Sequence, residues 1–295
     1  QQDIDAFLAL GIAPDTVLVS FGDMLRVPGS NTSLERQRAA GADVRIVYSP
    51  LDAVDIAANE PEKQVVFFGV GFETTMPAVA LAIANAAERG VANFTVYCVH
   101  KTMPAALRAL LTSDEVKVSG LLLPGHVTTI IGADAYDFIA EEFHVPCAVT
   151  GFEPVDMMLG VESILKQRAQ GEARIDNVYA RAVSNQANPL AAKLLERVFE
   201  ACDAEWRGIG TILGSGVRIR SAYSAFDARE RFLEAIAAVP AASVSACVCG
   251  DVLRGVIQPA DCPLFGTACT PSDPIGPCMV SSEGACAAAH RYGGQ

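Results

Sequence analysis

The sequence predicts an α/β protein with parallel sheets, and three observations support this fold class. Short apolar runs rich in β-branched residues recur along the first half of the chain, and helical segments separate them. The runs are apolar at nearly every position, which is typical of strands buried on both faces of a parallel sheet. Strands are expected at Thr16–Phe21, Val44–Tyr48, Val65–Val70, Phe94–Val99, Gly120–Leu123 and Cys147–Thr150.

The helices between these strands have recognisable ends. Thr32 and Glu35 have the spacing of a capping box, and the helix that they begin is expected to stop at Gly41. Pro50 directly follows a serine, as a first-turn proline does. An alanine-rich helix is expected over Met76–Arg89, with the next residue a glycine placed to end it.

A weak internal repeat suggests two similar lobes. The segments GFETTMPAVA at 71–80 and GFEPVDMMLG at 151–160 each follow an apolar strand and open a helix. We therefore expect two parallel-sheet α/β lobes that face a cleft, followed by a small C-terminal iron–sulfur module. The expected ranges are 1–88 for the first lobe, 89–243 for the second and 244–295 for the cysteine-rich module.

The C-terminal region carries the most visible chemistry, because it holds six of the nine cysteines. Four of them form the frame Cys249-x12-Cys262-x6-Cys269-x16-Cys286 in a stretch rich in Pro and Gly. Four thiolates hold a [4Fe–4S] cluster or a zinc ion. The wide gaps favour iron–sulfur, whereas structural zinc is usually held by close pairs and disulfide frameworks belong to small secreted domains. Cys247 and Cys278 are left over, as buried thiols or spare ligands.

Polar residues at the carboxyl ends of the expected strands are candidates for a second site, because ligands bind there in open α/β sheets. Glu73 and Glu153 follow two strands, and His126 follows a third. If the lobes face each other, these three side chains should line one cleft. The alternative for both glutamates is that they cap helix N-termini, where a carboxylate is favoured. For His126 the alternative is a hydrogen-bonded core residue.

Glu283 is a fourth candidate because it lies three residues before Cys286 in a tight Ser-Ser-Glu-Gly turn. It could tune the cluster or relay a proton toward the cleft through hydrogen bonds. The alternative is a surface acid that caps the turn. We expect Glu73, His126, Glu153 and Glu283 to share one concave region.

Composition limits the classes of partner. The chain has 295 residues, 51% of them hydrophobic, and a net charge of −12 with a pI near 4.8. Nucleic-acid binding needs clustered Lys and Arg, which are absent from the sequence. No apolar stretch reaches the length of a membrane span of about 18 residues. Cysteines without disulfide-type spacing favour a reducing cytoplasm.

Long motifs spread over the whole chain resemble those of one family. The C-terminal strings CPLFGTACTP and GPCMVSSEGACAAAHRY are preceded, in order, by SFGDMLRVPGS, GADVRIVYSP, VVFFGVGFETTMP, PGHVTTIIGADAYDFIA, GFEPVDMMLG and EWRGIG. Together they resemble the HypD family of [NiFe]-hydrogenase maturation proteins. The resemblance implies a [4Fe–4S] scaffold on which an Fe(CN)2(CO) group is assembled as transient cargo. It also implies a HypC-type chaperone and a HypE-type cyanide donor as partners.

The chain departs from the family pattern in one respect. Members of the family carry a Cys-Gly-Gly-His-Thr-His motif and a Cys-Pro-x-Cys motif, and neither is found in these 295 residues. We therefore expect an N-terminally incomplete member that lacks the cysteine that binds Fe(CN)2(CO). Mixed with HypC, it should not show cyanide and carbonyl infrared bands. We also expect the strand at Thr16–Phe21 to lack neighbours along its edge.

Two classes of function follow from these observations. The resemblance favours a maturation scaffold that uses its cluster for electron transfer and turns over no substrate of its own. The alternative is a stand-alone iron–sulfur redox or lyase enzyme acting on a small substrate. A scaffold should co-purify with small protein partners, whereas an enzyme should act alone. A cluster with a purely structural role would not need to cycle between redox states.

Overall fold

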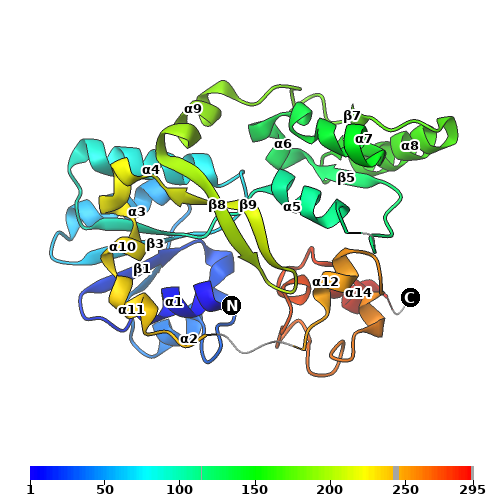
Figure 1. The fold of residues 1–295 in the computed structure, drawn as a ribbon. Coiled ribbons are helices and arrows are strands. Elements are labelled where there is room, and N and C mark those ends of the chain that lie inside the picture. The colour runs from blue at the N-terminus through cyan, green and yellow to red at the C-terminus, as the bar shows by residue number, and fades with distance from the viewer. Residues whose placement is uncertain (114, 242–245, 294–295) are drawn as a thin grey trace.

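A computed structural model describes residues 1–113, 115–241 and 246–293. It contains two parallel sheets, one antiparallel hairpin and a helical C-terminal segment (Figure 1). The mixed α/β class with parallel sheets is therefore confirmed. Within the described ranges, no helix is both long and apolar enough to cross a membrane.

The larger sheet has four parallel strands in the order β2-β1-β3-β4. Its strands agree with the expected positions to within two residues at either end, and they span Thr16–Ser20 (β1), Val44–Ile46 (β2), Gln64–Gly69 (β3) and Phe94–Cys98 (β4). Because β1 pairs with β2 on one side and with β3 on the other, it is an interior strand. The expectation that this strand lacks neighbours along its edge is therefore wrong.

Successive residues of these strands point into two different cores, which explains their continuous apolarity. Val17 and Phe67 face one side of the sheet, where α3 and α4 cover them. Leu18 and Phe68 face the other side, where α1 packs. On that side the ring of Phe7 from α1 stacks on Phe68 with a centroid distance of 4.3 Å.

The helices of this region agree partly with the expected ends. They span Gln2–Leu10 (α1), Gly22–Arg26 (η1), Leu34–Ala39 (α2), Pro50–Asn59 (α3) and Met76–Arg89 (α4). Pro50 and Gly90 lie where expected, at the start of α3 and in a left-handed conformation after α4. The capping box at Thr32 and Glu35 is wrong by one residue, because Ser33 is the N-cap and its hydroxyl accepts from the Arg36 amide. Helix α1 was not expected.

The smaller sheet has three parallel strands, β5-β6-β7, at Leu121–Pro124, Cys147–Thr150 and Ile175–Asn177. The associated helices are Met103–Leu111 (α5), Gly125–Ile131 (α6), Ala133–Tyr136 (η2), Asp137–Phe143 (α7) and Pro154–Gln170 (α8). Helix α8 buries Gly160, Ser163 and Gln167 among its inward residues, and the Gln167 amide donates to the Cys147 carbonyl. Its outward face is mixed: Val155 is 69% and Met158 68% exposed, and an ion pair joins Lys166 to Glu162 on the same helix.

The chain then returns to the larger sheet. Helix α9 (Pro189–Val198) is followed by the hairpin of β8 (Phe199–Trp206) and β9 (Gly210–Ile219). Residues of all three join the core on the α4 side. The next helices, Ser221–Phe226 (η3), Ala228–Arg231 (α10) and Leu233–Ala237 (α11), end against α1 and β4.

The expected domain ranges do not coincide with the sheets. Residue 88 precedes β4, which pairs with β3, and residues 189–237 pack on the larger sheet although they fall within the range 89–243. The expected start of the third range, at residue 244, lies outside the described residues. The division into two lobes and a cluster module stays a prediction.

We call residues 246–293 the cysteine segment. It contains four short helices, Cys249–Leu253 (α12), Pro259–Asp261 (η4), Pro277–Val280 (α13) and Ala285–Tyr292 (α14). Its buried core consists of Cys249, Cys269, Cys278, Met279, Cys286 and Ala287. Thiols therefore take the place that branched aliphatic side chains fill in the two sheets.

Candidate functional site

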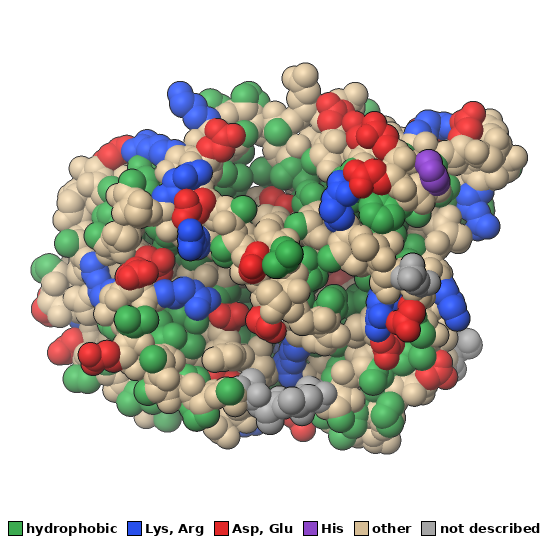
Figure 2. Space-filling view, viewed as in Figure 1, with side chains coloured by type: hydrophobic (Ala, Val, Ile, Leu, Met, Phe, Trp, Pro, Cys, Tyr) green, Lys and Arg blue, Asp and Glu red, His purple; other side chains and the backbone are tan. Residues whose placement is uncertain are grey.

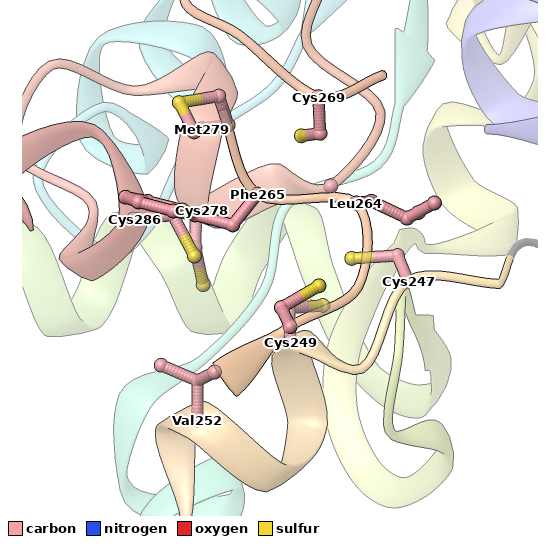
Figure 3. Close-up of a pocket in the computed structure, with 11 residues that line it drawn as sticks. Cys247, Cys249, Val252, Leu264, Phe265, Cys269, Cys278, Met279 and Cys286 are labelled. Carbon is pink, nitrogen blue, oxygen red and sulfur yellow. The ribbon is translucent and has the colours of Figure 1, made fainter. Parts of the chain in front are cut away.

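All six cysteines of the cysteine segment line one pocket. The four of the expected frame, Cys249, Cys262, Cys269 and Cys286, reach it from separate helices and turns, and Cys247 and Cys278 join them. Figure 3 shows the labelled cysteine side chains around a common space, together with Leu264, Phe265 and Met279. The lining contains no carboxylate or imidazole, so the donor set is purely sulfur.

One backbone amide donates to a sulfur atom of the pocket, and burial keeps thiols of the pocket protonated. The Ile275 amide donates to Cys269 Sγ at 3.3 Å, and hydrogen bonds to the sulfurs are one of the factors that tune cluster potentials. Burial raises the pKa of Cys286 and of Cys247 to about 11. Metal coordination would deprotonate such thiols outright. In the described parts of the chain, no three His, Cys, Asp or Glu side chains are placed to hold a single metal ion.

Glu73 is buried, with 4% of its surface exposed. It lies in the loop between β3 and α4, and its Oε1 accepts from the Met103 amide, the first residue of α5, at 2.9 Å. Its Oε2 has no partner among the described residues. Burial raises the pKa of this carboxyl above its usual range. Glu73 therefore lies at a helix N-terminus, as the capping alternative held, but the helix is α5 and not the α4 that follows it.

Replacing Glu73 with glutamine tests whether this charge is needed. Because the folded pKa is raised, the unfolded chain loses its proton first, and stability declines as the pH rises through the unfolded value near 4.5. We expect Glu73→Gln to gain stability relative to wild type between pH 4 and pH 7, measured by urea unfolding at each pH. A variant that is less stable at pH 7 would show that the ionised form is held by favourable contacts.

His126 and the loop before Glu153 lie next to each other at the end of the smaller sheet. The His126 ring is exposed on α6, and its centroid lies 4.9 Å from that of Phe152. The N-cap position of α8 is occupied by Glu153, whose carboxylate pairs with Arg181 at 3.2 Å instead of bonding to the helix amides. The same guanidinium lowers the pKa of Asp156 to about 2. His126 is not a buried core histidine.

Glu283 is exposed in the turn between α13 and α14, where its amide donates to Ser281 Oγ. Among the interactions of the described residues, none joins it to Glu73, His126 or Glu153. The expectation that these four residues share one concave region stays a prediction. Of these four residues, a ring contact brings together His126 on α6 and the loop that leads to Glu153.

A second pocket, of about 640 Å³, lies beside the carboxyl end of β4. Cys98, His100 and Lys101 line it from that strand end, and Arg207 and Arg229 line it from later segments. Cys98 Sγ lies 3.5 Å from His100 Nδ1, and burial raises the pKa of the thiol to about 12. Burial also lowers the pKa of His100 to about 3. The two side chains are therefore neutral near pH 7.

Arg229 is the site residue that the sequence least reveals. Its Nη2 donates to Asp3 Oδ1 at 2.8 Å, and its guanidinium stacks over the Tyr97 ring. Its Nε donates to the Cys98 carbonyl. The strand-end rule identifies Cys98 and His100 as pocket residues, but no local pattern indicates that a residue 131 positions later closes the same pocket.

Parallel α/β sheets joined to a thiol-lined pocket define the class: an α/β protein with a sulfur donor site in its last 50 or so residues. Comparison with known proteins gives the family. Residues 1–293 match the family model described as "HypD: Hydrogenase formation hypA family". The chain belongs to this family, and its role lies in hydrogenase maturation.

Similar curated proteins agree with this assignment. The chain is 48% identical to the hydrogenase maturation factor HypD of Rhodobacter capsulatus, over 99% of this chain and 78% of that protein. It is 46% identical to the HypD of Rhizobium leguminosarum bv. viciae, over 98% and 77% respectively. For the HypD of Escherichia coli K12 the identity is 44%, again over 98% and 77%.

Proposed function

We propose that this chain is a scaffold for assembling the Fe(CN)2(CO) group of [NiFe]-hydrogenases and that it carries a [4Fe–4S] cluster. Family membership supports the maturation role. The observation that carries the cluster proposal is the pocket lined by six cysteines, with apolar side chains between them. The cluster, when bound, would supply electrons to the assembly reaction.

Within this proposal the cluster ligands are Cys249, Cys262, Cys269 and Cys286. All four line the pocket, and three of them belong to the buried core of the cysteine segment. Cys247 is the alternative to Cys249, because it lies two residues away and lines the same pocket. Cys278 lines the pocket too and is the other spare thiol.

Partners and cargo are part of the same proposal. A HypC-type chaperone and a HypE-type cyanide donor would deliver and share the iron group, which is cargo and not a resident cofactor. Glu73, His126, Glu153 and Glu283 remain the candidates for contacts with that cargo in a cleft between two lobes. Cys98, Cys147 and Cys202, which lie outside the cysteine segment, are free thiols, in keeping with a reducing cytoplasm. On the face shown in Figure 2, acidic and basic side chains are interspersed and do not form a basic patch for nucleic acid.

Anaerobic reconstitution with iron and sulfide tests the cluster proposal. We expect on the order of four iron atoms per chain and an absorption band that bleaches with dithionite and returns on oxidation. Zinc in place of iron would overturn the cluster assignment, and a cluster that cannot be reduced would overturn the electron-transfer role.

Co-purification separates the scaffold from the alternative enzyme. The reconstituted chain is mixed with a purified HypC-type protein and passed over a sizing column. A stable complex without turnover of small substrates supports the scaffold. A chain that does not bind the chaperone but turns over a small substrate supports the stand-alone enzyme.

A further inference from the structure

The turn of the β8–β9 hairpin is the part of the chain that meets the thiol pocket from outside the cysteine segment. We call residues Trp206–Ile209 the hairpin tip. The hairpin crosses from the larger sheet to α12, as Figure 1 shows. At its end, the Arg207 carbonyl accepts a hydrogen bond from Cys249 Sγ at 3.6 Å.

The contact between the hairpin tip and α12 leaves no room for a side chain at two glycines. A Cβ atom on Gly208 would lie 2.3 Å from Cys249 Sγ. A Cβ atom on Gly250 would lie 2.1 Å from the Gly208 carbonyl oxygen. Backbone therefore packs directly against backbone and thiol, so a displacement of the hairpin tip must move Cys249.

The other side of the hairpin tip is held firmly. Trp206 Nε1 donates to Ser215 Oγ at 2.7 Å, and its ring lies 6.0 Å from that of Phe72 in the loop after β3. The Lys101 ammonium lies over the same indole ring. Lys101 also donates to the Glu205 carbonyl. The hairpin tip is thus fixed to the carboxyl ends of β3 and β4.

The far end of α12 is fixed independently. The Lys117 amide donates to the Arg254 carbonyl at 3.1 Å, and the Arg254 guanidinium pairs with Glu115 at 2.6 Å. Helix α12 therefore lies between the hairpin tip at its first residue and the segment 115–117 at its last turn. The thiol at the start of α12, Cys249, is therefore held by a contact from outside the cysteine segment.

We propose that the hairpin tip is a positioning element for the thiol pocket: it fixes Cys249 and the start of α12 relative to the larger sheet. Gly208 is the residue on which this depends, because any side chain there would displace the thiol. Arg207 lines the 640 Å³ pocket and presents its carbonyl to Cys249, so the hairpin tip joins the two pockets. The consequence for a cluster rests on the proposed function, but the contact itself does not.

Gly208→Ala tests the proposal, and Gly210→Ala is its matched control. Both glycines have positive φ, +84° and +103°, so both alanines strain the backbone, but a Cβ on Gly210 meets nothing within 4 Å. We expect Gly208→Ala to lose iron to a chelator on the order of 10-fold faster than wild type, the size typical of altered ligand surroundings. Its reduced cluster should also give a shifted electron paramagnetic resonance spectrum. Gly210→Ala should match wild type in both measurements.

Alkylation of the cluster-free chain gives a second readout. Cys249 is buried, so iodoacetamide should label it slowly in wild type and in Gly210→Ala but faster in Gly208→Ala, as followed by peptide mass spectrometry. If Gly208→Ala does not fold, Trp206→Phe removes the hydrogen bond to Ser215 and should also speed labelling of Cys249. Equal labelling and equal iron retention in the two alanine variants would overturn the proposal. If the wild-type chain binds no iron, the proposed function is wrong, but the labelling test of the hairpin tip can still be made because it uses the cluster-free chain.

Discussion

Cys262→Ser is expected to lower the iron content of the reconstituted chain from about four atoms to nearly none, because the proposed cluster is held by one cysteine thiolate at each iron. The same loss is expected for Cys269→Ser and Cys286→Ser. Iron and sulfide analysis under anaerobic conditions measures it. Cys202→Ser is the matched control, because Cys202 lies on β8 outside the thiol pocket.

The remaining cysteines of the pocket make this experiment specific. We expect Cys249→Ser to lose the cluster, and we expect Cys247→Ser and Cys278→Ser to keep it, although both thiols line the same pocket. If Cys247→Ser loses the cluster and Cys249→Ser keeps it, the fourth ligand is Cys247 and not Cys249. Full retention in Cys262→Ser would remove the ligand assignment altogether.

Phe7→Ala is expected to destabilise the fold by about 3–5 kcal/mol, as removal of a buried aromatic ring does. Phe7 is fully buried, and its ring stacks on Phe68 and lies 6.1 Å from the ring of Tyr97. Urea unfolding followed by circular dichroism measures the change. A loss of stability this large would show that α1 packs on the larger sheet as part of the folded core.

The control for Phe7→Ala comes from the end of the same helix region. Ile12 is 78% exposed, so Ile12→Ala should change stability by no more than about 0.5 kcal/mol. If the two variants unfold at the same urea concentration, α1 does not pack on the sheet in solution.

The sequence predicted β1 to β6 well because their signal is local, and it missed β7 to β9. Each expected strand is apolar at consecutive positions, and the structure shows why: neighbours such as Val17 and Leu18 face two different buried cores. The ends of α3 and α4 were predicted for the same reason, since Pro50 and Gly90 act on their own turn of backbone.

The hairpin and α1 were missed because their patterns are weak. Strand β8 alternates between buried or half-buried and more exposed residues, and its main partner is β9, to which no local pattern joins it. Its first residue, Phe199, joins the core on the α4 side, more than 100 positions away in sequence. The site shows the same limit. The partner of Glu73 is an amide 30 residues away, and Cys247 and Cys278 reach the thiol pocket through folding that no spacing reveals.

The return of the chain to the larger sheet sets the order in which that core can be completed. Its two cores combine residues from α1 through β4 with residues from α9 through α11, and the whole smaller sheet lies between these two stretches of sequence. Closing such a long loop costs entropy before the late contacts form, and folding dominated by distant contacts is slow.

A ribosome-bound chain would therefore expose part of the larger core until residues near Ile236 have emerged. The smaller sheet has its own core, so it can fold before the core of the larger sheet is complete. During that interval the uncovered apolar side of the larger sheet, where Val198 and Phe199 later pack, would be open to non-native association. The risk of misfolding during synthesis therefore depends on the distance in sequence between β4 and α9.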